Sequence, residues 1–190
     1  MTTPHQTRPA TDATHTFASV AFQREQARST GEIEVGSSQI QSDAAIPDRH
    51  TDYGDGASPA LHWNPVGGAR SYVLLVEDPD APKAQPFVHW LAWNIPPDVH
   101  ELAGGMAQAA EPDGVTGMRQ GLNGQGTTGY FGPRPPRGDR PHHYHFQVFA
   151  LDRMLVLPDE ASRDDVLQAM GGHVLAKGQL VATSEAPATQ

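Results

Sequence analysis

The chain of 190 residues contains no cysteine. Disulfide bonds, thiolate nucleophiles and metal sites with cysteine ligands are therefore excluded. Long apolar runs are also missing, because the longest aliphatic run, at 72–76, is far shorter than the roughly 20 residues that cross a bilayer. The N-terminal sequence lacks the basic segment and apolar segment of a secretory signal. From these absences we expect a cytoplasmic protein without a transmembrane segment.

Positive charge is scarce. Lys and Arg number 13 against 22 Asp and Glu, which gives a formal net charge of -9. Nucleic acids and anionic membrane surfaces both require a positive protein face. Neither is expected as a partner, and any anion must be bound by a local group of donors.

Glycine and proline are abundant, with 19 and 17 residues. This content is below that of low-complexity chains but high for a helical protein, and the length suits one domain. We therefore expect one loop-rich, mainly β domain at 16–184. A flexible tail at 1–15 precedes it, and a polar tail at 185–190 follows it.

Four segments have the composition of β-strands. Residues 71–78 (SYVLLVED) and 87–95 (FVHWLAWNI) are apolar and flank a proline-rich corner, so they are expected to be adjacent strands. Residues 143–152 (HYHFQVFALD) alternate and are rich in aromatics, and a last short strand is expected at 178–183 (GQLVAT). The Gly-rich stretch 96–129 predicts a long surface excursion.

One helix is expected between the last two strands. Ser162 can cap its N-terminus, and Asp165 can complete a reciprocal cap. The apolar residues that follow have near-helical spacing, and Gly171 and Gly172 end the segment. Nearer the N-terminus the pattern is weak: AFQREQARS could form a helical turn or a strand, and IEVGSSQI could form a strand that enters a loop.

Two acidic residues, Asp78 and Asp80, lie on the proline-braced corner DPDAP. Its simplest interpretation is a turn, in which proline fixes the backbone and aspartate accepts a local hydrogen bond. Carboxylates held there could also orient a histidine or accept an ammonium group. His89 follows a few residues later, in an apolar strand where a single histidine is most simply a core residue.

A second, distant histidine cluster favours a functional interpretation. In HHYHF, strand alternation places His142 and Tyr144 on one face and His143 and His145 on the other. Together with His89, the first face would offer imidazole and phenol donors to the oxygens of a phosphate.

Metal sites are the alternative. His143 and His145 have the H-x-H spacing of a cupin site, although the next four residues, FQVF, supply no acidic ligand. A 2-His-1-carboxylate site could instead combine His89, His142 and Asp78. Either arrangement would indicate a metal-dependent enzyme.

The loop GPRPPRG at 132–138 leads into this cluster. It is most simply a surface connection, or a polyproline ligand for a partner. Gly132 would let the backbone approach a ligand closely, and Arg134 and Arg137 would add charge at a pocket rim. The sequence lacks GxSxG, HExxH, a P-loop and GxGxxG, and it offers no obvious nucleophile beside a base, so no catalytic set stands out.

Taken in order, DPDAP, HW and the pattern G-x-x-P-P-x-G-x-x-x-H-x-Y resemble the phosphatidylethanolamine-binding protein family. The resemblance is strongest to its bacterial Raf-kinase-inhibitor-like branch. The segments IPDRHTDYGDGASPALHW, NIPP and GHVLAKGQLVAT extend it over residues 33–183.

The resemblance implies a mainly β fold, in which a large antiparallel sheet packs on a smaller one with a short C-terminal helix. It also implies a binding protein without a cofactor rather than an enzyme. Its small pocket would bind phosphate-like anions or phosphorylated headgroups, and regulation of a kinase or protease and a homodimer are implied as well. A cis peptide bond is implied before a proline of DPDAP. The implied pocket residues are Asp78, Asp80, His89, Gly132, Pro136, His142 and Tyr144.

Two positions depart from the family pattern. Arg134 stands where a small residue is usual, so a narrower pocket or a changed anion preference is expected. His143 stands where arginine is common, on the face away from the expected ligand. We also expect anion affinity to rise as histidines gain protons between about pH 6 and 7.

Overall fold

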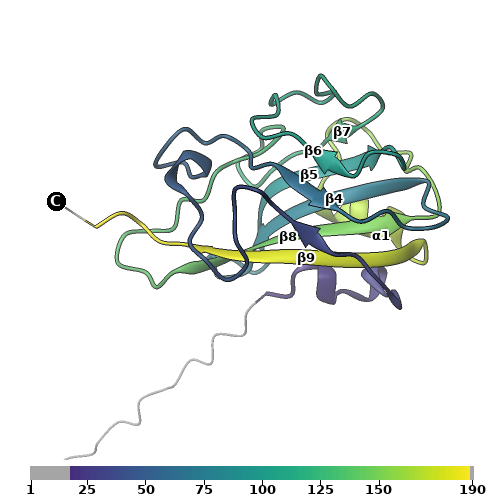
Figure 1. The fold of residues 1–190 in the computed structure, drawn as a ribbon. Coiled ribbons are helices and arrows are strands. Elements are labelled where there is room, and N and C mark those ends of the chain that lie inside the picture. Colours follow the sequence, from purple (N-terminus) through teal and green to yellow (C-terminus); the bar gives the residue numbers. More distant parts are fainter. Residues whose placement is uncertain (1–17, 189–190) are drawn as a thin grey trace, which may run out of the picture.

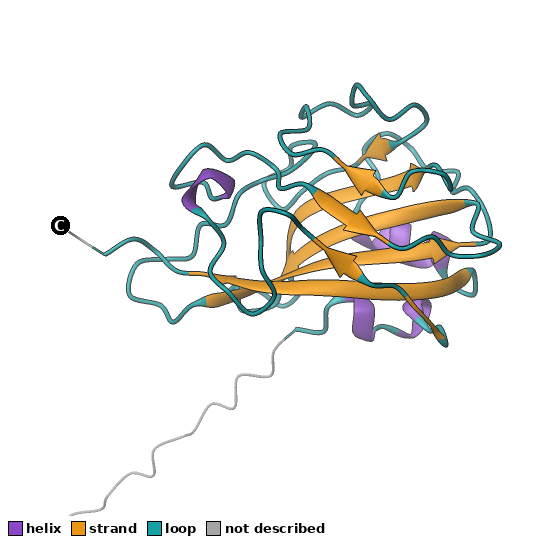
Figure 2. Ribbon diagram, viewed as in Figure 1, coloured by secondary structure: helices purple, strands orange, loops and turns teal. Residues whose placement is uncertain are grey.

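Two β-sheets form the body of the protein (Figures 1 and 2). The computed structural model describes residues 18–188. The larger sheet has the strand order β1-β9-β8-β4-β5-β7, and the smaller has the order β2-β3-β6. The strands are β1 (Gly31–Glu32), β2 (Val35–Gly36), β3 (Leu61–Trp63), β4 (Ser71–Asp78), β5 (Phe87–Ile95), β6 (Glu101–Leu102), β7 (Arg119–Gln120), β8 (His142–Leu151) and β9 (Val174–Ser184).

Neighbouring strands are antiparallel except for β1 and β9, which are parallel. The helical elements are the 3-10 turns η1 (Ala21–Gln23), η2 (Glu25–Ala27) and η3 (Asp48–His50), and the helix α1 (Arg163–Met170). This arrangement confirms the predicted mainly β fold with one short helix near the C-terminus.

The central strand β4 is buried on both faces of the large sheet. Tyr72, Leu74 and Val76 belong to the core between the two sheets. Val73 and Leu75 belong to a second core on the outer face, which α1, η1 and η2 cover. Because both faces are covered, the strand reads as a continuous apolar run rather than an alternating one.

The helix α1 begins and ends as its caps predict. Ser162 Oγ accepts a hydrogen bond from the backbone N–H of Asp165, and Asp165 Oδ2 accepts one from the backbone N–H of Ser162 at 2.8 Å. Gly171 follows the last helical residue.

One expectation about secondary structure was wrong. The last strand is not short, because β9 spans eleven residues. Polar side chains along β9 hide its strand pattern in the sequence. In the structure other parts of the chain contact them; Lys177 Nζ, for example, donates to the backbone oxygen of Phe22 at 2.7 Å. Of the two alternatives for AFQREQARS, the structure shows the helical one, because the segment forms the turns η1 and η2. The segment IEVGSSQI contributes the two residues of β2 and then enters a loop.

The cis peptide bond expected in DPDAP was also wrong, because no peptide bond within 18–188 is cis. The stiffness of this corner has another source. Asp78 Oδ1 accepts the backbone N–H groups of Asp80, at 2.8 Å, and Ala81, at 3.1 Å. The carboxylate therefore closes the turn in which it lies.

The predicted surface excursion at 96–129 is mostly irregular, but its short strands β6 and β7 pair with β3 and β5, and the buried side chain of Gln120 adds further hydrogen bonds. Gln120 Oε1 accepts from Trp90 Nε1 at 2.6 Å, and Gln120 Nε2 donates to the backbone oxygens of Ala107 and Ala109. In the described part of the chain, no helix has the length and apolar character needed to cross a membrane. The predicted tail at 1–15 lies outside the described residues, and the domain boundaries stay predictions.

Candidate functional site

A cavity of about 180 Å³ opens where β4 ends and β8 begins. Its walls come from the DPDAP corner, β5, the proline-rich loop and β8. The lining residues are Asp78, Ala81, Pro82, Lys83, Phe87, His89, Gln125, Phe131, Arg134, Pro135, Pro136, His142 and Tyr144. Of the eight predicted site residues, only Asp80 and Gly132 are missing from this lining.

A β-bulge accompanies His89 in the cavity wall. Val76 pairs with Trp90 and Glu77 pairs with Val88, so His89 has no partner on β4. Bulges change the direction of side chains and are frequent beside functional sites. The His89 ring lies at 5.0 Å from the ring of Tyr144, in an edge-to-face arrangement.

His89 is a neutral ring with one free lone pair. Its Nδ1 donates to the backbone oxygen of Phe131 at 2.7 Å. Burial lowers the pKa of His89 to about 4, although the bond to Phe131 opposes this shift. In this form Nε2 accepts a hydrogen bond and does not donate one. In the ligand-free protein His89 is therefore neutral between pH 6 and 7.

Asp78 fixes the orientation of His142. Asp78 Oδ2 lies 2.8 Å from His142 Nδ1, and both side chains are almost fully buried. Because the carboxylate accepts, Nδ1 carries the hydrogen, and Nε2 gains one only when the ring is cationic. Burial raises the pKa of the Asp78 carboxyl, and the hydrogen bond and charge of His142 reduce that shift.

Tyr144 supplies the clearest donor to the cavity. Its side chain is buried, and its Oη has no hydrogen-bond partner among the described residues. Burial and the nearby charge of Asp78 raise the pKa of this phenol above its ordinary value. The O–H group therefore stays protonated and can donate to a ligand.

Two cations line the cavity at its rim. Arg134 Nη1 lies 2.8 Å from Asp52 Oδ2, and the Arg134 side chain is 64% exposed. Lys83 Nζ lies 4.6 Å from the centroid of the Phe87 ring. Both charges are available to an anion that enters from solvent.

Gly132 supports the cavity wall from behind. A Cβ at this position would lie 2.5 Å from the backbone nitrogen of Asp52 and 2.6 Å from the carbonyl carbon of Thr51. The absence of a side chain lets the proline-rich loop pack against residues 51–52. The structure thus places Gly132 against protein backbone, outside the cavity lining.

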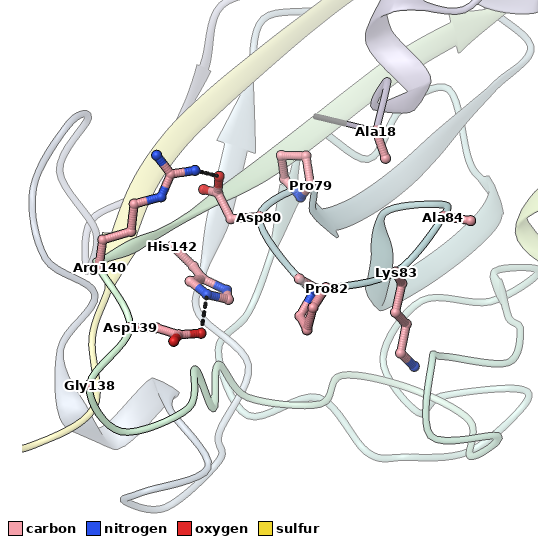
Figure 3. A pocket seen from close by; sticks show the side chains of 11 residues that line it. Ala18, Pro79, Asp80, Pro82, Lys83, Ala84, Gly138, Asp139, Arg140 and His142 are labelled. Atoms are coloured by element: carbon pink, nitrogen blue, oxygen red, sulfur yellow. Dashed lines mark hydrogen bonds and ion pairs between the residues drawn. The ribbon is translucent and has the colours of Figure 1, made fainter. Parts of the chain in front are cut away.

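Asp80 faces away from the cavity, into a groove of about 760 Å³ (Figure 3). It accepts hydrogen bonds from Arg140 Nη2 at 3.1 Å and from both the backbone and ring nitrogens of His143. Burial acts to raise the pKa of Asp80, but these hydrogen bonds and the charge of Arg140 outweigh it, and the net pKa is lowered. His142 and Lys83 line both the groove and the cavity, so the two spaces adjoin.

Sequence reasoning missed several lining residues. Phe131 acts through its backbone oxygen, which carries no signal in the sequence. Gln125 comes from the irregular excursion, where periodicity gives no guidance. Lys83 and Phe87 flank DPDAP and HW closely enough that extending both motifs by two or three residues would have included them. Within residues 18–188, no group of three or more His, Cys, Asp or Glu side chains could hold a metal ion.

Comparison with known proteins gives a family for this fold and cavity. The profile described as phosphatidylethanolamine-binding protein matches residues 36–185. The chain belongs to this family. A UPF0098 protein of Pyrococcus abyssi is 43% identical over 150 residues, which cover 78% of this chain and 83% of the relative. A UPF0098 protein of Methanothermobacter thermautotrophicus is 46% identical over 138 residues, or 72% of this chain and 87% of the relative.

Two solved structures of phosphatidylethanolamine-binding protein relatives have the same fold. Escherichia coli YbcL superposes with a TM-score of 0.76 and 31% identity, covering 83% of this chain and all of that one. A putative homologue from Chlamydia trachomatis superposes with a TM-score of 0.73 and 34% identity, with the same coverage.

Proposed function

We propose that this member of the phosphatidylethanolamine-binding protein family binds a phosphate-like anion or phosphorylated headgroup in the 180 Å³ cavity, without catalysis. The observation that carries the proposal is the buried Tyr144 Oη, a protonated donor without a protein partner. A buried polar group without a partner is costly, so a ligand atom that accepts from it stabilises the site.

The cavity size favours a phosphoryl group over a larger ligand. At about 30 Å³ per water molecule, the space holds only a few solvent-sized groups. Drug-sized ligands usually occupy about 300 to 1,000 Å³. The remainder of a larger phosphorylated ligand would therefore lie in the adjoining groove or in solvent.

The protonation states predict how the anion sits. One phosphoryl oxygen accepts from Tyr144 Oη, and a P–OH group donates to the free lone pair of neutral His89 Nε2. His142 is held by Asp78 through Nδ1, and its Nε2 lies 3.6 Å from Asp139 Oδ2. Lys83 and Arg134 add charge at the rim.

A protein partner that presents a phosphorylated segment is compatible with this site. Regulation of a kinase or protease, a homodimer and a cytoplasmic location stay predictions from the sequence and its resemblance. The alternative of a metal-dependent enzyme makes a different prediction, because ligand binding would then require a metal.

Calorimetric titration with phosphate and phosphorylethanolamine tests the proposal. Tyr144→Phe should weaken binding about tenfold or more, since a hydrogen bond to a charged group contributes about 1.5–3 kcal/mol. Tyr72→Phe is the matched control, because the Tyr72 hydroxyl accepts from Val66 N within the core, away from the cavity. Equal affinity in Tyr144→Phe and the parent protein would refute the proposed pose. Binding that disappears with a chelator would favour the metal alternative.

A further inference from the structure

The protein fixes one hydrogen-bond donor and one acceptor inside the 180 Å³ cavity. Tyr144 Oη is the donor, because it is protonated and has no partner among the described residues. His89 Nε2 is the acceptor, because Nδ1 of the same ring donates to the backbone oxygen of Phe131 at 2.7 Å. The two rings meet edge to face with their centroids 5.0 Å apart, so one tetrahedral anion can reach both groups.

The surroundings of His89 keep its ring neutral. Burial and, to a smaller extent, the charge of His142 lower the pKa of His89 to about 4, against the opposing effect of the bond to Phe131. The titratable and charged groups that share the cavity with His89 are Asp78 of β4, Lys83 of the DPDAP connection, Arg134 of the proline-rich loop, and His142 and Tyr144 of β8. The two cations at the rim attract anions of equal charge alike, so they do not distinguish between such ligands.

Asp78 and His142 are already paired within the protein. Asp78 Oδ1 accepts from the backbone N–H groups of Asp80 and Ala81, and Asp78 Oδ2 lies 2.8 Å from His142 Nδ1. His142 Nε2 lies 3.6 Å from Asp139 Oδ2 (Figure 3), so both ring nitrogens have a carboxylate as neighbour. A carboxylate in the wall also repels a second negative charge on a ligand.

An anion that satisfies both fixed groups must accept one hydrogen bond and donate another. A singly protonated phosphate monoester does both, because its free oxygens accept and its P–OH group donates. A sulfate ester and a phosphodiester carry no such proton near neutral pH. Either would place an anionic oxygen against the lone pair of His89 Nε2 or leave that buried nitrogen without a partner, and both outcomes are costly.

We propose that the cavity selects the singly protonated form of a phosphate monoester over sulfate esters and phosphodiesters, with His89 Nε2 as the atom that detects the ligand proton. This inference rests on the proposed function, because it names the chemical class of anion for the same cavity. A site built around a ligand O–H group strongly rejects analogues that lack it. The headgroup of an intact phospholipid is a phosphodiester, so such a lipid is not the preferred ligand.

Three ligands that share an ethanolamine group test the selectivity: phosphorylethanolamine, ethanolamine O-sulfate and glycerophosphorylethanolamine. Calorimetry with the tag-free full chain gives their affinities. At about pH 5 a phosphate monoester is mostly singly charged, since its second pKa is about 6. The three anionic groups then carry the same charge, and the monoester alone carries a proton. It should bind at least about tenfold more tightly than the other two ligands.

The same titrations at about pH 8 separate the ligand proton from protons on the protein. Phosphorylethanolamine has lost its last phosphoryl proton at this pH, so its affinity should fall about tenfold or more. The charge of the sulfate group stays constant, so the affinity of ethanolamine O-sulfate reports changes in the protein alone. Protonation of histidines would tighten both ligands alike at low pH. An equal preference at both pH values would therefore overturn the inference.

His89→Gln tests the role of the imidazole. An amide can donate as well as accept, so this variant should bring the affinities of phosphorylethanolamine and ethanolamine O-sulfate within about threefold of each other at about pH 5. His50→Gln is the matched control, because His50 is also buried and bonded through Nδ1 to a backbone oxygen, that of Ala57 at 2.8 Å, but lies outside the cavity lining. The control should keep the parent selectivity.

The outcomes distinguish this inference from the proposed function. Equal affinity of the parent protein for the three ligands would overturn the selectivity and leave anion binding intact, whatever the variants do. Parent-like selectivity in His89→Gln would also overturn it, because another group would then detect the proton. Absence of binding by phosphate and phosphorylethanolamine at both pH values would refute the proposed function, and this inference with it.

Discussion

Arg134 places a cation at the rim of the cavity. Its guanidinium is mostly exposed and is held by Asp52, so the charge stands at the entrance. The resemblance to the family predicts a narrower pocket or a changed anion preference at this position, and both stay predictions. Arg134 is one of the residues that line the cavity of about 180 Å³.

We expect Arg134→Ala to weaken phosphate binding about fivefold and to leave stability nearly unchanged, because an exposed ion pair contributes about 0–1 kcal/mol. The loss of affinity should shrink as salt is added, since salt screens exposed charges. Calorimetry at low and high ionic strength measures both effects. Arg134→Lys should recover most of the affinity. A gain of affinity in Arg134→Ala would instead support the narrowing that the sequence suggested.

At the scale of elements, a buried ion pair joins three parts of the outer face. Arg163, the first residue of α1, donates to Glu77 of β4, and Glu77 also accepts from the N-terminal turn η1. Arg163 Nη2 donates further to the backbone oxygen of Ser19 at 3.1 Å. The helix, the strand and the N-terminal segment are thus connected through one carboxylate.

Arg163→Met should destabilise the protein by about 3–5 kcal/mol, because it leaves a buried carboxylate without its partner. Urea unfolding measures the change. Arg28→Met is the matched control, because Arg28 pairs with Glu25 on the surface, where both side chains are at least 80% exposed. The control should behave like the parent protein. Equal stability of Arg163→Met and the control would show that the pair does not hold these elements together.

At the scale of the whole molecule, the buried histidine of the cavity links stability to pH. The pKa of His89 is about 4 in the folded protein, against an ordinary value of 6.5. Above pH 6.5 the ring is neutral in both states. As the pH falls from 6.5 to 4, the unfolded chain binds a proton that the folded protein does not bind. Folding stability is therefore lost across this range.

The difference in the pKa of His89 between the folded and unfolded states lowers the free energy of unfolding by roughly 3 kcal/mol between pH 7 and pH 4. Asp78 acts in the opposite direction, because its pKa is raised in the folded state. As the pH falls, the folded protein therefore binds a proton at Asp78 before the unfolded chain does. Urea unfolding of the parent protein and His89→Gln at several pH values separates the two effects. The free-energy advantage of the parent over the variant should shrink as the pH falls. Parallel pH profiles would show that His89 is not the group responsible.

Local sequence determined much of the fold. The strands at 71–78 and 87–95 have the predicted bounds, because apolar runs between proline and glycine leave few alternatives. The caps at Ser162 and Gly171 likewise determined α1, since their hydrogen bonds are made within one turn. Alternation along β8 also predicted which of its histidines share the cavity with Tyr144.

Only the tertiary structure decided the properties that depend on contacts between distant residues. The bulge at His89, the pairing of Asp78 with His142 and the separation of Asp80 from the cavity each require the register between strands. The neutral state of His89 requires burial by chain from other elements. Residue types and spacing thus determine which side chains are present, whereas long-range packing determines their partners and protonation, because both depend on surroundings that local sequence does not encode.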